Sequence, residues 1–267
     1  MAEKDSGGES QWWSKCRLCE QDFAGAVSYA IAWALWRAYA SDGTEQVEHR
    51  MMLGALEFLS MRVGEKANGV SPEEAIKIHE ALLAECLAAT GAEELERDDI
   101  FDRIMCNETI KQRADARLLF TRIVDARSRL AGCYEALGRS DDAIDLMVKC
   151  HSWTVTLNGA GHGKSILYAI NVALAMHRAG RYVQARSFCR APIEALANPN
   201  FERGLHLRLT AASVETALDA VKGVALLEVI VRDARRAIGD GSQIALLSKR
   251  VLDDASQGLE RSQAGNK

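Results

Sequence analysis

Apolar residues recur along most of this chain every three or four positions, which is the spacing of an amphipathic helix. Val, Ile and Thr form no alternating run of useful length, so no strand is predicted. Turn signals such as Asn68-Gly69 separate the apolar runs. The pattern therefore predicts an all-α protein. The predicted helices cover 20–40, 45–66, 71–90 and 111–137, with a short helix near 99–105 and a terminal helix over 242–257.

The clearest pattern is an internal repeat with an offset of 42 residues. The segments LAGCYEALGRSDDAIDLMVKC and VALAMHRAGRYVQARSFCRAP align over their whole length at this offset. Gly138 matches Gly180, where a first helix needs a left-handed residue to end. Ala143 matches Ala185, where a second helix crosses the first closely. Because neither helix can bury its apolar side alone, the repeat predicts helical hairpins that stack on one another.

This repeat resembles the tetratricopeptide repeat family, and its length is similar to that of the long repeats of kinesin light chains. Those repeats carry a loop resembling L-G-P-D-H-P between hairpins, followed by a helix with an N-L-A segment. Here the loop is Leu157-Asn158-Gly159-Ala160-Gly161-His162-Gly163, and Asn171-Val172-Ala173 follows. The resemblance covers residues 127–197. It implies a right-handed α-solenoid of stacked hairpins with an extra N-terminal helical segment.

The flanking parts of the chain are assigned from composition and from weaker matches. The register outside 127–197 stays open: Gly223 lies 43 residues after Gly180, but Glu228 stands where the pattern requires alanine. Ala225 is nearer, which implies a shortened turn. Whether the N-terminal segment holds a degenerate repeat also stays open. The predicted parts are a loose tail over 1–19, the N-terminal helical segment over 20–110, repeats with a C-terminal capping helix over 111–258, and a loose tail over 259–267.

The resemblance implies a non-catalytic scaffold that binds a peptide or helix of a partner protein. In such arrays the first helices of the hairpins line a concave face. Asn171 matches the groove asparagine of the kinesin-light-chain type. Gly132 and Leu174 stand where repeats that bind chaperone tails have asparagine, so that specificity is not predicted. The residues predicted to bind the partner are Arg129, Asn171, Leu174, His177 and Arg178.

The stretch Phe23–Trp36 is the most apolar in the chain. It has 14 residues before Arg37, whereas a membrane-spanning helix needs roughly 20. No membrane span is therefore predicted. Either this helix is buried in the fold or it docks to a partner. The second reading gives the alternative function, a structural subunit or assembly factor of a larger complex that docks through this aromatic helix.

Charge and cysteine usage exclude several classes of protein. The formal net charge of −4 argues against a nucleic-acid partner, because nucleic-acid binding needs a concentrated basic face. The seven cysteines are odd in number, and most stand singly in helical patterns. This usage predicts free thiols in the cytoplasm or another reducing intracellular compartment. The polar N-terminus is followed by no apolar signal segment, so secretion is not predicted.

Two motifs invite a chemical interpretation, and neither is complete. The segment Gly159–Ser165 ends in the GKS of a phosphate-binding loop, but Asn158 replaces the required glycine and a helix precedes the loop. Cys16 and Cys19 have the spacing of half a zinc site, and no second pair follows. No Ser-His-Asp or Cys-His arrangement is evident. The sequence therefore predicts no nucleotide, no metal, no cofactor and no catalysis.

Overall fold

The computed structural model describes residues 27–34, 59, 70–88, 114–199 and 201–265, and they form two compact units, 1–137 and 138–267. The described residues contain helices and no strand, which confirms the all-α prediction for this part of the chain. The predicted tail over 1–19, most of the predicted helix over 45–66 and the short helix near 99–105 lie outside the described residues. The two units are defined by which residues contact one another, whereas the predicted domains are defined by the sequence repeat. The two divisions are therefore not comparable, and the predicted domain ranges stay a prediction.

Unit 1 contains a helical segment over 27–34, α3 (Pro72–Ala88) and α6 (Ala114–Ala136), and α3 packs on α6. Helix α3 begins as the sequence predicted: the Ser71 hydroxyl accepts a hydrogen bond from the backbone N–H of Glu74 at 3.2 Å. Tyr29 and Trp33 pack against the core of this unit, so this part of the aromatic stretch contributes to its own fold. The core includes Ala32, Leu59, Ile78, Leu82 and Ile123.

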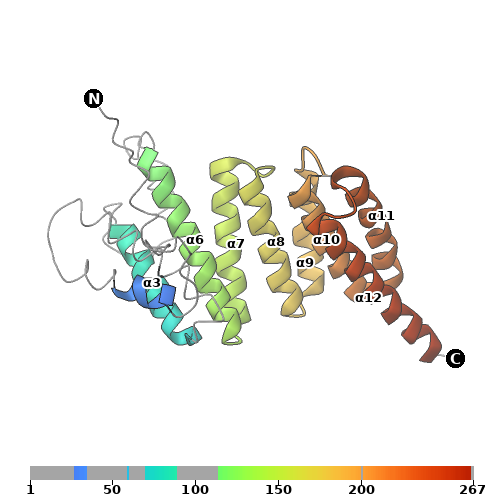
Figure 1. The fold of residues 1–267 in the computed structure, drawn as a ribbon, viewed down its shortest axis with the longest axis horizontal. Helices are drawn as coiled ribbons and strands as arrows, with labels where there is room; N and C mark the ends of the chain where they lie inside the picture. Colours follow the sequence, from blue (N-terminus) through green and yellow to red (C-terminus); the bar gives the residue numbers. More distant parts are fainter. Residues whose placement is uncertain (1–26, 35–58, 60–69, 89–113, 200, 266–267) are drawn as a thin grey trace. The chain divides into compact units, whose positions relative to one another are not determined.

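Unit 2 contains six consecutive helices, and each packs on the next (Figure 1). Helix α10 lies at the centre, because it also contacts α8 and α12. Its buried residues include Leu205, Leu207, Val214 and Glu215, which lie on more than one side of the helix. The helices are α7 (Ser140–Asn158), α8 (Gly163–Arg178), α9 (Tyr182–Glu194), α10 (Glu202–Leu218), α11 (Ala220–Ile238) and α12 (Gln243–Gly265).

The glycines of the repeat adopt the conformation that the sequence predicted. Gly138 and Gly180 have φ angles of 75° and 72°, a region that L side chains rarely adopt. After α8, the N–H of Arg181 donates to the carbonyl of Met176 at 2.8 Å, which closes the helix end. Ala143 and Ala185 are fully buried as the fourth residues of α7 and α9.

The turn between α10 and α11 is built differently from the turns at Gly138 and Gly180. Helix α11 follows α10 directly through Asp219, whose side chain accepts from the backbone N–H of Lys222 at 3.1 Å. Gly223 is the fourth residue of α11 and is buried, so it takes the place of Ala143 and Ala185. Its alignment with Gly180 was wrong, and so was the choice of the exposed Ala225 for the alanine place. The turn is shortened, as the sequence implied. The shortening arises because no glycine corresponding to Gly138 and Gly180 stands between α10 and α11.

A second copy of the loop before α8 leads into α12. Gly159 and Gly239 end α7 and α11 with nearly equal φ and ψ angles, 88° and 153° against 84° and 157°. In both loops the N–H three residues later donates back to the glycine carbonyl, at 3.2 and 3.3 Å. Helix α12 therefore begins in the same way as α8, which is the first helix of a hairpin. It continues to Gly265, so the loose tail predicted over 259–267 was wrong for 259–265.

Candidate functional site

One side of helix α8 is left uncovered by the helices of unit 2. Its residues are spaced three or four apart, so they share one stripe of the helix surface. Leu167 is 39% exposed, Arg178 is exposed, and the others are half-buried. We call this surface the α8 stripe, and it consists of Lys164, Leu167, Asn171, Leu174 and Arg178.

The other sides of α8 are fixed by neighbouring helices. Toward α7, the hydroxyl of the buried Ser165 donates to the carbonyl of Thr154 at 3.0 Å. Toward α10, Ile166 and Ile170 form a buried cluster with Leu207. Because α8 is held on both of these sides, the direction of the α8 stripe is set by the fold rather than by a mobile loop.

The centre of the stripe combines apolar surface with an amide. Leu167 and Leu174 lie on either side of Asn171, and Leu174 also packs against the cluster around Ile166. Among the described residues, the side-chain amide of Asn171 makes no hydrogen bond. An amide can both donate and accept, so Asn171 is available to pair with a peptide backbone.

Cations lie at both ends of the stripe. Helix α8 contains no acidic residue, and Lys164 and Arg178 stand near its two ends. The guanidinium of Arg203 on α10 lies beside the start of α8, because a Cβ atom on Gly163 would be 2.7 Å from it. The helix N-terminus adds partial positive charge there. Glu202 precedes Arg203, but no carboxylate belongs to the stripe itself.

The five residues predicted to bind a partner lie on two helices, four on α8 and Arg129 on α6. Asn171, Leu174 and Arg178 lie together on the α8 stripe. His177 is turned toward the start of α9, where its ring contacts that of Tyr182 with centroids 5.2 Å apart. Burial, helped by the charge of Arg178, lowers the pKa of His177.

Arg129 belongs to α6 in unit 1, not to the α8 stripe. It is half-buried, and its charge acts with burial to lower the pKa of His79 to about 4, burial being the larger cause. Lys164 and Leu167, which also belong to the α8 stripe, were not among the residues predicted from the sequence. They could have been found, because they precede Asn171 by seven and four residues and so fall on the same helical stripe.

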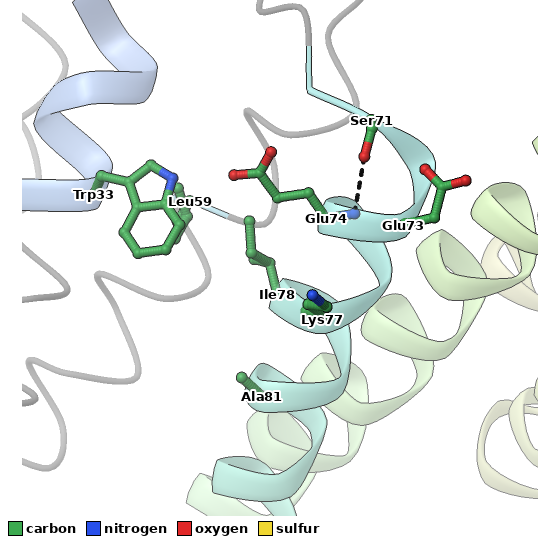
Figure 2. Close-up of a pocket in the computed structure, with 8 residues that line it drawn as sticks. All are labelled: Trp33, Leu59, Ser71, Glu73, Glu74, Lys77, Ile78 and Ala81. Carbon is green, nitrogen blue, oxygen red and sulfur yellow. Dashed lines mark hydrogen bonds between the residues drawn. The ribbon is translucent and has the colours of Figure 1, made fainter.

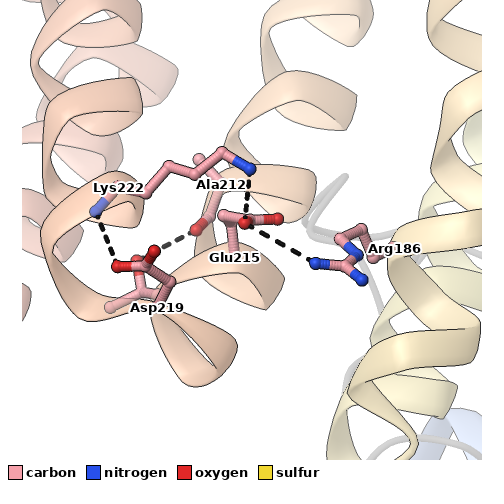
Figure 3. A network of polar contacts seen from close by, with 6 residues as sticks. Arg186, Ala212, Glu215, Asp219 and Lys222 are labelled. Atoms are coloured by element: carbon pink, nitrogen blue, oxygen red, sulfur yellow. Dashed lines mark hydrogen bonds and ion pairs between the residues drawn. The ribbon is translucent and has the colours of Figure 1, made fainter.

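A buried carboxylate links the three helices beyond α8 (Figure 3). The side chain of Glu215 on α10 is 7% exposed. One of its oxygens lies 2.8 Å from Lys222 Nζ of α11 and 3.9 Å from Arg186 of α9. Both cations are at least half exposed. This arrangement can hold α10 in place between its neighbours.

The loop before α8 does not have the surroundings of a phosphate-binding loop. Helix α7 precedes it, and the backbone N–H of Lys164 already donates to Nδ1 of His162 at 3.2 Å. Such N–H groups would have to face a bound phosphate. The absence of nucleotide binding stays a prediction, for which these contacts are physical reasons.

The described residues hold no group of three or more His, Cys, Asp or Glu side chains that could bind a metal ion. Cys16 and Cys19 lie outside the described residues. The four cysteines that the structure describes are free thiols: Cys86, Cys133, Cys150 and Cys189. No helix in the described ranges is both long enough and apolar enough to cross a membrane.

Comparison with solved structures identifies the fold. The chain is similar to a Podosopora anserina protein described as a kinesin light chain with nearly identical TPR-like repeats, with a TM-score of 0.58 and 16% sequence identity. The match covers 79% of this chain and 87% of that one. A single-substitution variant of the same protein matches with a TM-score of 0.58 and 15% identity, over 78% and 86% of the two chains. No family model and no curated protein matches. The chain therefore has a tetratricopeptide-like repeat fold, as the sequence predicted.

Proposed function

We propose that this protein is a non-catalytic scaffold that binds an extended peptide or a helix of a partner protein on the α8 stripe. The observation that carries the proposal is the stripe itself, which unit 2 holds rigidly and leaves uncovered. Tetratricopeptide-like folds are used for binding proteins rather than for chemistry. We further propose that the protein works in the cytoplasm or another reducing compartment, where its free thiols persist.

The chemistry of the stripe indicates which kind of partner segment fits it. Leu167 and Leu174 offer apolar surface for a large apolar side chain of the partner. Asn171 can hydrogen-bond the partner's backbone, and Lys164, Arg178 and Arg203 favour acidic side chains at both ends. The segment proposed is therefore an acidic peptide with an apolar anchor, not a nucleic acid.

The alternative function, docking through the aromatic N-terminal helix, has less support. Tyr29 and Trp33 contribute to the core of unit 1, and Tyr29 also donates a hydrogen bond to Glu74. Both side chains are half-buried against this core and neither is exposed on the surface, where a helix that docks to another protein would present them. Val27 is exposed, but one apolar side chain does not make a docking surface.

The test compares two leucines of the same exposure. Leu167 on the α8 stripe is 39% exposed, and Leu226 on α11 is 41% exposed. We expect Leu167→Asp to abolish recovery of bound proteins when the tagged chain is purified from cells and analysed by quantitative mass spectrometry. Leu226→Asp should recover the same proteins as the wild type. Equal recovery by both variants, with both folded by circular dichroism, would reject the stripe as the binding surface.

A further inference from the structure

Unit 1 contains a cavity of about 490 Å³ between α3 and the side chains of Trp33 and Leu59 (Figure 2). This volume falls within the range of small-molecule sites, roughly 300–1,000 Å³. The cavity has an apolar part and a charged rim. Its lining residues are Trp33, Leu59, Ser71, Glu73, Glu74, Lys77, Ile78 and Ala81.

The apolar part fits a hydrocarbon or aromatic body. Ile78 and Ala81 lie on the side of α3 that faces Trp33 and Leu59 (Figure 2). Leu59 and Ile78 are buried, whereas the indole of Trp33 is half-buried and so remains partly accessible from the cavity. Apolar surface that a ligand buries here contributes roughly 25 cal/mol per Å².

The rim places one carboxylate over this apolar part. Glu74 lies four residues before Ile78, on the same side of α3, while Glu73 points away from Trp33 (Figure 2). The hydroxyl of Tyr29 donates to Oε1 of Glu74 at 3.2 Å, which orients the carboxylate. A tyrosine hydroxyl is protonated at neutral pH, so it is a donor to the carboxylate, and burial raises the pKa of Tyr29 further.

The side of the rim nearest Trp33 favours a cation. Of the two carboxylates among the described lining residues, only that of Glu74 lies on the side of α3 that faces Trp33, and Lys77 also lines the cavity (Figure 2). The Ser71 hydroxyl is already engaged by the N–H of Glu74. The face of an indole also attracts an ammonium group, through the quadrupole of the ring. An ammonium group gains from both the carboxylate and the ring, whereas an anionic group would be repelled by the Glu74 carboxylate.

We propose that this cavity binds an organic ammonium ion, whose apolar body lies against Trp33 and Ile78 and whose ammonium group pairs with Glu74. This site is separate from the α8 stripe, and the proposal does not depend on the proposed function. The ammonium group belongs either to a small free amine or to a lysine side chain of another polypeptide.

The test uses nuclear magnetic resonance of the full chain titrated with phenethylammonium. We expect shifts of the Trp33 indole N–H and of the α3 amides, and weaker binding of the neutral isostere 2-phenylethanol. Glu74→Gln should weaken phenethylammonium binding about threefold or more, as the loss of a partly exposed ion pair does. Glu73→Gln is the control: it changes the same charge one residue away and should leave the affinity unaltered.

A second titration, with Nα-acetyl-lysine N-methylamide, distinguishes the sources. Binding of this probe with the same dependence on Glu74 assigns the site to a lysine side chain, and binding of phenethylammonium alone assigns it to a free amine. The proposal is overturned if neither amine shifts these signals up to its solubility limit. It is also overturned if the alcohol binds as tightly as the amine, or if the two glutamine variants behave alike.

Discussion

Asn171 and Ala173 are two residues apart on α8 and play opposite roles. Ala173 is fully buried, whereas Asn171 lies on the α8 stripe. We expect Ala173→Asp to destabilise the protein by several kcal/mol, because it places a charge in a packed interior. Asn171→Ala should change the free energy of unfolding by well under ~1 kcal/mol and still weaken partner binding. Thermal melts and partner affinity measure both, and a wild-type melt for Ala173→Asp would contradict the helix register.

Gly223 is required by packing rather than by a turn. A Cβ atom there would lie 2.2 Å from the Thr216 hydroxyl and 2.4 Å from the Thr216 Cα atom, so backbone would have to move. We expect Gly223→Ala to destabilise the protein by about 2 kcal/mol, in the range of overpacked cores. Gly258→Ala is the control, since nothing lies near it and alanine favours a helix. Chemical denaturation should show loss of stability only for Gly223→Ala.

The glycines of the repeat show where sequence reasoning succeeded and where it failed. Gly138 and Gly180 were identified because the segments around them, including Ala143 and Ala185 five residues later, align at a fixed offset. Gly223 was misassigned because a glycine at a helix crossing and a glycine at a turn look the same in sequence. The distinction depends on the distance between α10 and α11, which no local pattern contains.

The Glu215 contacts make a prediction about how helices α9, α10 and α11 are held. The side chains of Lys222 and Arg186 are 60% and 50% exposed, so water can solvate them if Glu215 is lost. We therefore expect Glu215→Leu to change stability by no more than about 1 kcal/mol. The double variant Lys222→Ala and Arg186→Ala leaves a buried carboxylate without its cations and should cost about 3 kcal/mol. If denaturation experiments show a larger loss of stability for Glu215→Leu than for the double variant, the attraction between the charges outweighs the cost of burying the carboxylate.

At the scale of helices and loops, the sequence predicted the hairpin from α8 to α9 and missed the recurrence after α11. The loops at Gly159 and Gly239 share backbone geometry but little sequence beyond their glycines. The N-cap is His162 in one and Ser242 in the other, and both side chains accept a backbone N–H. The donor is the N–H two residues after His162 in one loop and three residues after Ser242 in the other. Different side chains and different donors cap the two helices, so only the backbone reveals the repeat.

Aligning α8 with α12 through these two loops also explains why α12 can end the repeat array. Ile166, Ala169 and Ile170 of α8 correspond to Leu246, Lys249 and Arg250 of α12, an offset of 80 set by the two loops. The first set is buried, and the second is exposed. Charged residues on this face of α12 disfavour the packing of another hairpin, as in a terminal capping helix.

For the whole molecule, we expect stability to fall as the pH is lowered from about 6.5 to 4. His79 is 2% exposed and its pKa is lowered to about 4, mainly by burial. In this window the unfolded chain binds a proton that the folded chain does not, so acid favours unfolding. The shift corresponds to roughly 3 kcal/mol at 1.36 kcal/mol per unit.

The matched measurement is the free energy of unfolding of the wild type and of His79→Leu at pH 7 and pH 5. Between pH 7 and pH 5 the wild type should lose about 2 kcal/mol more of its unfolding free energy than His79→Leu does. His151, His177 and His206, whose pKa values burial also lowers, should contribute in the same direction in both proteins. Identical pH dependence of the two proteins would show that folding does not lower the pKa of His79.

The central claim is that a partner segment binds on the α8 stripe, and photo-crosslinking tests it most directly. A benzophenone side chain is introduced at position 167 in one variant and at position 226 in another, which are equally exposed leucines in unit 2. After irradiation in cells, mass spectrometry identifies the attached peptides. We predict that position 167 attaches to an acidic segment of one partner, and that position 226 does not. Attachment of the same segment at 226 and not at 167 would contradict the proposed binding surface.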